Sequence, residues 1–233
     1  MIVALDVESA KEARMIVNGI GGEAAAYKIG LQLFTAAGPD FVREVAAEHR
    51  VFLDLKFHDI PNTVAKAGVE AARLGVWMFN VHASGGGEMM RQTVNEVGNA
   101  ARENGITRPL IIGVTVLTSS DANTLAETGI ERVPEDQVLD LARLAFNCGL
   151  DGIVASALEV SGVRKTVHDP NFLIVTPGVR PETATKDDQK RVTTPRRAAS
   201  NGADYLVVGR PILEASDRVA ALRAIQEEID TVS

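Results

Sequence analysis

The stretch "FLDLKFHDIPNTV", residues 52–64, reads as a β-strand followed by the entry into a helix. Residues of helical period continue from Thr63 through "TVAKAGVEAARLG". A strand that leads into a helix is the repeating unit of parallel α/β folds. Asp54 and Lys56 fall on the same face of this strand, because successive side chains alternate between faces. A strand rarely carries two charges on the face that should be buried, so the stretch indicates both a fold and a site.

The strand-to-helix unit recurs along the whole chain. The predicted strands are residues 2–6, 25–30, 51–56, 77–83, 110–117, 152–156, 172–178 and 205–209. The predicted helices are residues 9–20, 39–49, 63–75, 86–105, 135–149, 158–167, 195–202 and 212–229. This alternation predicts an α/β fold, a (β/α)8 TIM barrel, as a single domain over residues 1–233. A doubly wound open sheet is the alternative, but the first turn, "LDVESAKEA", lacks the G-x-G-x-x-G pattern.

Composition excludes several classes of protein. Apolar residues make up 45% of the chain and aromatic residues 4%, so the core is expected to consist mainly of Ala, Val, Leu and Ile. The net charge of −7 argues against a general nucleic-acid or anionic-membrane binder. Cys148 is the only cysteine, and the longest apolar run, "PLIIGVTVL", is too short to span a bilayer. With no basic segment before "MIVALDV", these features predict a soluble, cytoplasmic protein.

Polar residues gather where the predicted strands end, which is where barrel enzymes carry their chemistry. The residues at these positions are Asp6, Lys28, Asp54, Lys56, His82, Ser84, Thr118, Arg180, Gly209 and Arg210. The opposite strand ends show mostly ordinary helix-to-strand turns. This asymmetry predicts the site at the carboxyl end of the barrel.

Charges of alternating sign are expected at the first three strand ends. Asp6 and Lys28 end the first two strands, so they are expected to lie beside Asp54 and Lys56, with Asp59 just past the third strand. An ion-pair network that only plugs the barrel is the alternative. Desolvating charges costs several kcal/mol each, and apolar side chains fill such a space equally well. We therefore favour a chemical role for the cluster.

The cluster suits one kind of reaction. Nearby carboxylates favour the charged form of Lys56, which predicts a general acid rather than an imine-forming lysine. A substrate carboxylate beside Asp54 would be repelled, and its loss as carbon dioxide would relieve that repulsion. Lys56 would stabilise and then protonate the carbanion left behind. Ground-state repulsion and preorganised electrostatics are both compatible with this arrangement.

Two glycine-containing segments predict a phosphate site. "TPGVR" (176–180) and "VVGRP" (207–211) follow the last two strands, where barrels commonly bind phosphate. Gly178 and Gly209 would let backbone N–H groups approach the anion, and Arg210 would offer a paired donor fork. Residues 180–195 are long for a barrel loop and are expected to fold over bound phosphate. Two ordinary turns and a solvated loop are the alternative.

The sequence resembles the orotidine 5′-phosphate decarboxylase family. The resemblance rests on "ALD" (4–6), "YKIG" (27–30), "DLKFHDIPNT" (54–63), "NVHASGG" (80–86), "GVTVLTS" (113–119), "TPGVRP" (176–181) and "VVGRPI" (207–212). These segments are spread over essentially the whole chain and occur in the same order as in the family. The resemblance implies a (β/α)8 barrel that converts orotidine 5′-monophosphate to UMP in pyrimidine biosynthesis. It also implies that no metal and no organic cofactor take part.

The resemblance also implies roles for individual residues. Lys56 matches the family's proton donor, and Lys28, Asp54 and Asp59 match its charged network. The positions implied to bind substrate are Asp6, Lys28, Asp59, Thr63, Thr118, Arg180, Gln189, Gly209 and Arg210. Either Thr118 or its neighbour Ser119 is expected to meet the pyrimidine. The counterparts of Asp59 and Thr63 reach across a two-fold interface, which implies a homodimer.

Other functions remain open on the sequence. A metal-dependent sugar-phosphate decarboxylase shares a similar Asp-x-Lys-x-x-Asp pattern, and a Schiff-base aldolase would use Lys56 differently. A non-catalytic barrel that binds nucleotide phosphate would not need the charged cluster. His58 and His82 lie near the site, but they lack metal-ligand spacing, so we expect structural roles for both.

Overall fold

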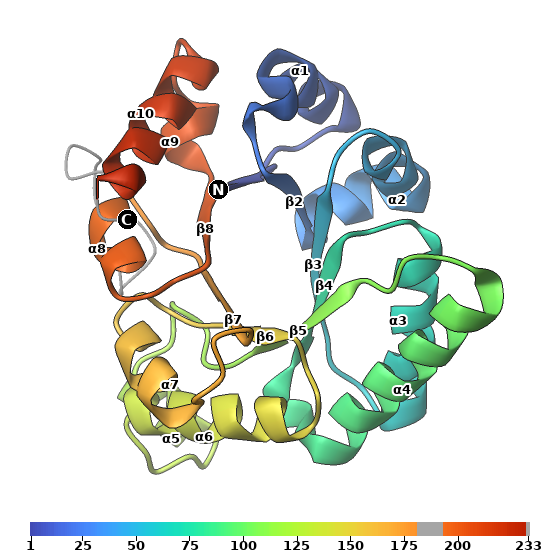
Figure 1. Ribbon diagram of the computed structural model, residues 1–233, viewed down its shortest axis with the longest axis vertical. Coiled ribbons are helices and arrows are strands. Elements are labelled where there is room, and N and C mark those ends of the chain that lie inside the picture. Colours follow the sequence, from blue (N-terminus) through green and yellow to red (C-terminus); the bar gives the residue numbers. More distant parts are fainter. Residues whose placement is uncertain (181–192, 232–233) are drawn as a thin grey trace.

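A computed structural model describes residues 1–180 and 193–231 and has the predicted barrel at its centre (Figure 1). Eight parallel strands follow one another in chain order, and β8 pairs with β1 to close the sheet. The strands are β1 (Ile2–Ala4), β2 (Ala26–Gly30), β3 (Val51–Phe57), β4 (Met78–His82), β5 (Leu110–Val114), β6 (Gly152–Val154), β7 (Leu173–Thr176) and β8 (Tyr205–Val208).

Helices surround this barrel and cover its outer face (Figure 1). They are α1 (Ala10–Ile20), α2 (Leu31–Ala46), α3 (Pro61–Arg73), α4 (Gly86–Asn104), α5 (Ala122–Glu127), α6 (Pro134–Asn147), α7 (Val160–Thr166), α8 (Pro195–Ser200), α9 (Arg210–Leu213) and α10 (Arg218–Asp230). Over residues 1–180 and 193–231, no helix combines the length and the apolar character needed to cross a bilayer.

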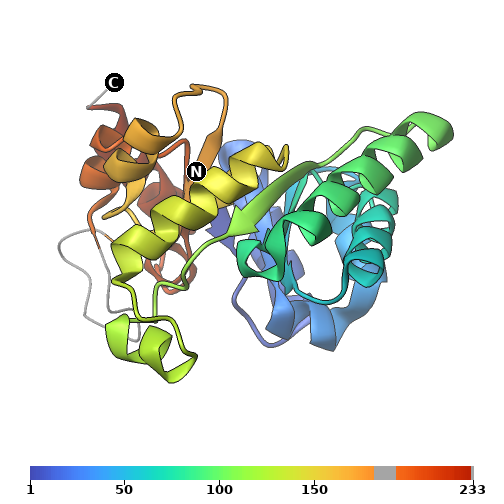
Figure 2. The ribbon, with the colours of Figure 1, turned by 90° about the horizontal axis from the view of Figure 1, so that it is seen from below.

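Three helical regions differ from the sequence-based prediction. The expected last helix, 212–229, is two helices, and Asp217 caps the second by accepting from the Ala220 N–H. Helix α2 begins at Leu31 rather than at residue 39, with a kink at Gly38, whose φ is 72°. The short α5, which was not predicted, is capped by Asp121 and lies beyond one end of α6 (Figure 2).

Several strands end earlier than the sequence pattern suggests. The predicted strand 110–117 leaves the regular ladder after Val114, and the predicted strand 172–178 leaves it after Thr176. The residues that follow still extend toward the carboxyl end of the barrel, where the chain turns into loops. Past the end of β5, Thr115 and Val116 are still buried, whereas Leu117 is 40% exposed, so the apolar pattern of the sequence continues beyond the regular strand pairing.

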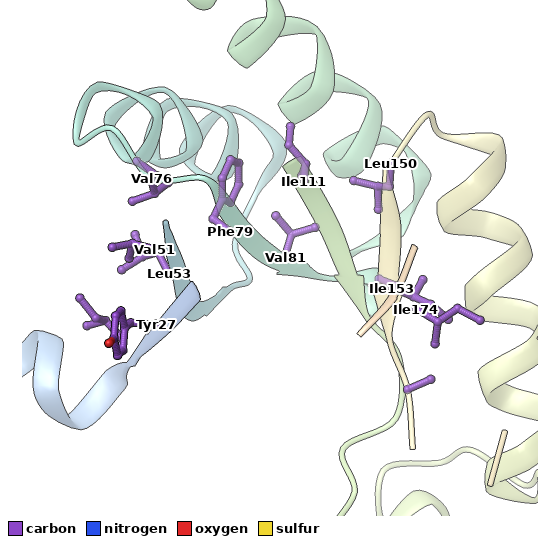
Figure 3. Close-up of a cluster of buried hydrophobic side chains, with 14 of the residues drawn as sticks. Tyr27, Val51, Leu53, Val76, Phe79, Val81, Ile111, Leu150, Ile153 and Ile174 are labelled. Atoms are coloured by element: carbon purple, nitrogen blue, oxygen red, sulfur yellow. The ribbon is translucent and has the colours of Figure 1, made fainter. Parts of the chain in front are cut away.

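Alternation along the strands produces two packed layers. Outward-facing residues such as Leu53, Phe79, Ile111 and Ile174 pack in the main core, between the strands and the helices (Figure 3). A smaller cluster fills the barrel interior, and it consists of Ile2, Ala4, Ala26, Phe52, Met78, Ile112, Val175 and Val207. This apolar plug leaves only the carboxyl end of the interior for polar side chains.

Candidate active site

Four charged side chains form a continuous row at the carboxyl end of the barrel. The Lys28 ammonium lies 3.0 Å from Asp6 Oδ1 and 3.4 Å from Asp54 Oδ2. The Lys56 ammonium lies 2.6 Å from Asp54 Oδ1. The order is therefore carboxylate, ammonium, carboxylate, ammonium, as the sequence predicted. We call these four residues the charge row.

Strand register brings the row together. In β1 and β2, Ala4 pairs with Lys28, and in β2 and β3, Gly30 pairs with Asp54, so side chains two residues apart share the interior face. Gly30 has a specific role in this packing. A Cβ atom at Gly30 would lie 3.2 Å from Lys28 Nζ, closer than ordinary van der Waals contact. The missing side chain leaves room for the lysine.

The centre of the row is buried and charged. Lys28 and Asp54 are each 9% exposed. Burial alone would raise the pKa of Asp54, but Lys28, Lys56 and the Asn80 amide outweigh it and hold that pKa below its ordinary value. Burial would likewise lower the pKa of Lys28, but Asp54 and Asp6 outweigh it and raise that pKa. This pair is therefore ionised at neutral pH.

Lys56 has an unusual backbone. Its φ is 53°, and it is the only non-glycine residue with positive φ in the part of the chain that the structure describes. Such a conformation costs a non-glycine residue about 1–2 kcal/mol. The β3–β4 register shifts between Leu53 and Phe57, so the strand bulges at this point. Asn80, on β4, accepts from the Lys56 N–H at 2.8 Å. Simple strand alternation did not predict this irregularity.

A cavity of about 230 Å³ opens above the barrel interior and joins the two predicted parts of the site. All four residues of the charge row line one side of it. Its other lining residues that the sequence singled out are Thr118, Gly178, Arg180, Gly209 and Arg210. Ser119 is exposed and is not part of this lining, so of the two candidates only Thr118 faces the cavity. Gln189 lies outside the described residues.

Backbone conformation shapes the cationic end of the cavity. Gly178 has a φ of 74°, a conformation that a side chain would strain. Two residues later, the Arg180 N–H donates to the Thr193 carbonyl at 3.0 Å. A Cβ atom at Gly209 would lie 3.4 Å from Asp6 Oδ2, so the backbone that follows β8 lies beside the charge row. Arg180 and Arg210 both line the cavity at the end predicted to bind phosphate.

Two predicted site residues lie outside this cavity. Asp59 and Thr63 are exposed, and the Asp59 carboxylate accepts from the Ile60 N–H at 2.6 Å. Within residues 1–180 and 193–231, Asp59 forms no ion pair with Lys56 of the same chain, and it lies just past β3, where the sequence placed it. The neighbouring Ile60 is 67% exposed.

A histidine pair borders the charge row. The rings of His58 and His82 have centroids 5.2 Å apart. Burial lowers the pKa of His82, His58 and Lys56 lower it further, and Asp54 offsets part of this effect. His82 therefore responds to the charge of Lys56, a coupling that sequence spacing did not indicate.

Comparisons with known proteins agree with this geometry. A model of the orotidine 5'-phosphate decarboxylase / HUMPS family matches residues 1–225. The chain is 51% identical to an orotidine 5'-phosphate decarboxylase of Syntrophotalea carbinolica, over 98% of this chain and 94% of that protein. It is 48% identical to one of Nitrosococcus oceani, over 100% and 98% of the two chains.

Solved structures give the same result. The crystal structure of orotidine 5'-phosphate decarboxylase from Lactobacillus acidophilus superposes with a TM-score of 0.87 and 37% identity. The match covers 99% of this chain and 98% of that one. The family model, the curated relatives and the superposed structure each extend over nearly the whole barrel. This chain therefore belongs to the orotidine 5'-phosphate decarboxylase / HUMPS family.

Proposed function

We propose that this chain is a cytoplasmic enzyme that decarboxylates orotidine 5′-monophosphate to UMP, with Lys56 as the proton donor. The observation that carries the proposal is the position of Lys56, which lines the same cavity as Arg180 and Arg210. One end of the cavity thus offers a proton and fixed charges, and the other offers donors for a phosphate. Relatives about half identical to this chain carry the name of this activity.

The reaction follows from this arrangement. The phosphate binds near Gly209 and Arg210, and the pyrimidine ring reaches the charge row with its carboxylate toward Asp54. The bond between C6 and the carboxylate carbon breaks, carbon dioxide leaves, and the electron pair remains on C6. Lys56 Nζ donates a proton to C6, which yields UMP, and the amine then recovers a proton from water. The net reaction takes up one proton from solvent and releases carbon dioxide, so atoms and charge balance.

Preorganised charges account for a lower barrier. Enzymes lower barriers by roughly 8–23 kcal/mol, and an unstabilised carbanion requires a value near the top of that range. Lys28 holds the Asp54 carboxylate ionised, and Asp54 holds the Lys56 ammonium at 2.6 Å. These groups are in place before the substrate binds, so little reorganisation accompanies the reaction. Binding energy from the phosphate, which does not react, supports this placement.

The remaining residues fit contacts with the nucleotide. Asp6 has a side chain that is 56% exposed at the end of the row, where it can accept from a ribose hydroxyl. Thr118 lies on the cavity wall, where it can contact the pyrimidine. Gln189 is proposed to bind phosphate from the segment outside the described residues.

We further propose a homodimer in which Asp59 and Thr63 complete the active site of the partner. Both residues are exposed and lie away from the cavity of their own chain. Ile60 lies between them in the sequence and is 67% exposed, so this segment also presents an apolar side chain at the surface.

An assay in chelator-treated buffer tests the proposed activity. Loss of orotidine 5′-monophosphate absorbance without added metal is expected, together with release of carbon dioxide. Turnover that requires magnesium would instead indicate a metal-dependent sugar-phosphate decarboxylase. Binding of UMP without turnover would indicate a non-catalytic barrel. Trapping of substrate on Lys56 by borohydride would indicate imine chemistry and would refute the proton-donor role.

A further inference from the structure

The irregular part of β3 faces a single residue of β4. Leu53 pairs with Phe79, and the next ladder pair is Phe57 with Val81. Three residues of β3 therefore lie opposite Asn80 alone. These three residues include Asp54 and Lys56, both members of the charge row. The bulge thus lies where the proposed proton donor leaves the sheet.

Asn80 provides a partner for a backbone N–H group in the bulge. A buried backbone N–H needs a partner, and the shifted register takes the Lys56 N–H out of the regular ladder. The Asn80 Oδ1 atom accepts from this N–H at 2.8 Å. It does so while Lys56 has its left-handed φ of 53°. The amide therefore holds the lysine backbone in a conformation that strands do not normally contain.

The other end of the same amide holds the carboxylate partner of Lys56. Asn80 Nδ2 donates to Asp54 Oδ1 at 2.7 Å, and that oxygen also accepts from Lys56 Nζ at 2.6 Å. Asn80 is only 1% exposed, so water does not compete for these bonds. The chemistry fixes the orientation of the amide, because an oxygen must face the N–H and a nitrogen must face the carboxylate.

We propose that Asn80 is a positioning residue that sets where the Lys56 ammonium lies, through the lysine backbone on one side and Asp54 on the other. The inference rests on the proposed function of Lys56 as proton donor. A side chain that fixes both the origin of the lysine and its ionic partner determines the location of Nζ. Misplacement of a reacting group by about 1 Å lowers turnover by roughly 100-fold.

Two substitutions separate positioning from simple packing. Asn80→Ala removes both hydrogen bonds. Asn80→Asp preserves the shape, but its ionised carboxylate would repel Asp54. When protonated, the same carboxyl group can donate to Asp54 and accept from the Lys56 N–H, as the native amide does. Activity of Asn80→Asp relative to wild type is therefore expected to recover as the pH falls, whereas Asn80→Ala has no group that could produce such recovery.

Thr115→Val is the matched control. Thr115 is a buried residue just past the end of β5, and its hydroxyl donates to the Val154 carbonyl at 2.8 Å. This substitution removes a buried hydrogen bond at a similar level of the barrel without touching the charge row. It measures what the loss of one internal hydrogen bond does to turnover.

Turnover of orotidine 5′-monophosphate and affinity for UMP are measured for all four proteins. We expect kcat to fall about 100-fold in Asn80→Ala, with UMP affinity changed by less than about threefold. Thr115→Val should keep the wild-type kcat and the wild-type affinity for UMP. An Asn80→Ala kcat within about threefold of wild type would overturn the inference, as would parallel losses of kcat and UMP affinity. An Asn80→Asp profile that follows the wild type at every pH would also overturn it.

A crystal structure of Asn80→Asp at neutral pH separates this inference from the proposed function. We expect Lys56 to leave its left-handed conformation and Nζ to move away from Asp54. An unchanged Lys56 would overturn the inference. A wild-type enzyme that leaves orotidine 5′-monophosphate unchanged would overturn the proposed function, whatever the variant structure shows.

Discussion

The Lys28 ammonium lies 3.4 Å from the Asp54 carboxylate on the neighbouring strand, and their side chains are only 11% and 12% exposed. Each charge is desolvated, so each depends on the other to remain ionised. The pKa of Asp54 is lowered and that of Lys28 is raised, which is the expected sign when mutual attraction exceeds the effect of burial. Stability and activity therefore depend on the same two residues.

Asp54→Asn should destabilise the protein in a pH-dependent manner. The substitution leaves two ammonium groups without their shared carboxylate, so the free energy of unfolding at neutral pH should fall by about 3 kcal/mol. The folded-state pKa of Asp54 lies below its ordinary value of 3.8. Its contribution is thus fully present above that value and is lost as the pH falls through the folded-state pKa. Urea unfolding should show the free energies of unfolding of the two proteins converging as the pH falls below 3.8.

Asp40→Asn provides the control for this measurement. Asp40 pairs with Arg43 on the helix surface, and its side chain is 93% exposed. Exposed ion pairs contribute little to stability, so the free energy of unfolding should change by less than about 1 kcal/mol at any pH. Equal losses in the two variants would contradict the role of the buried row.

Lys56→Ala should abolish decarboxylation while the barrel remains folded. The ammonium is the proposed proton source, and Asp54 keeps Lys28 as an ionic partner at 3.4 Å after the change. Stopped-flow or absorbance assays should detect no turnover, while calorimetry should still detect UMP binding. Lys11→Ala, a change to an exposed lysine on α1, should keep wild-type rates. Substantial turnover in Lys56→Ala would assign the proton to another group.

His82 should titrate below its ordinary pKa of 6.5, because burial and the nearby His58 and Lys56 disfavour its charged form. In Lys56→Ala, the removal of a positive charge should raise its titration midpoint. The midpoint can be followed through the imidazole carbon-bound protons by NMR. A midpoint above 6.5 in the wild type would contradict this coupling, as would a midpoint that is the same in Lys56→Ala and the wild type.

Arg210→Ala should weaken nucleotide binding through the phosphate. Charge-assisted hydrogen bonds contribute about 1.5–3 kcal/mol, so UMP affinity should fall by about 10- to 100-fold. Uridine, which lacks the phosphate, should bind the variant and the wild type alike. Arg196→Ala alters an exposed arginine on α8 and should leave the affinities for both UMP and uridine unchanged. An equal loss for UMP and uridine would place Arg210 away from the phosphate.

Much of the fold and of the charge row was predictable because both depend on local periodicity. Eight strand patterns separated by helical segments predicted the barrel, and alternation within β3 placed Asp54 and Lys56 on one face. Leu55 and Phe57 pack with the outer core on the opposite face, as alternation requires. The alternation of faces therefore holds in this part of β3 even though its register with β4 shifts between Leu53 and Phe57.

The parts that were missed depend on contacts distant in sequence or on very short elements. The bulge at Lys56 is stabilised by Asn80, 24 residues away, and an asparagine within a strand pattern gives no sign of such a partner. Helix α5 has only 6 residues, too few to produce a helical period. The division of the last helix did have a local signal, because Asp217 is a favoured N-cap residue.

Mixing two inactive variants should restore activity if Asp59 acts across a dimer interface. Lys56→Ala lacks the proton donor, and Asp59→Ala lacks the group that a chain is proposed to contribute to its partner. In a mixed dimer, one site carries both defects and the other carries neither. Random reassociation of equal amounts should therefore recover about a quarter of wild-type activity.

Each variant alone should stay inactive at the same total concentration. Recovery should appear only after the subunits are allowed to exchange. Full activity of Asp59→Ala alone would place Asp59 outside the partner's site. The same conclusion would follow if the mixture stayed inactive although mass spectrometry showed that mixed dimers had formed.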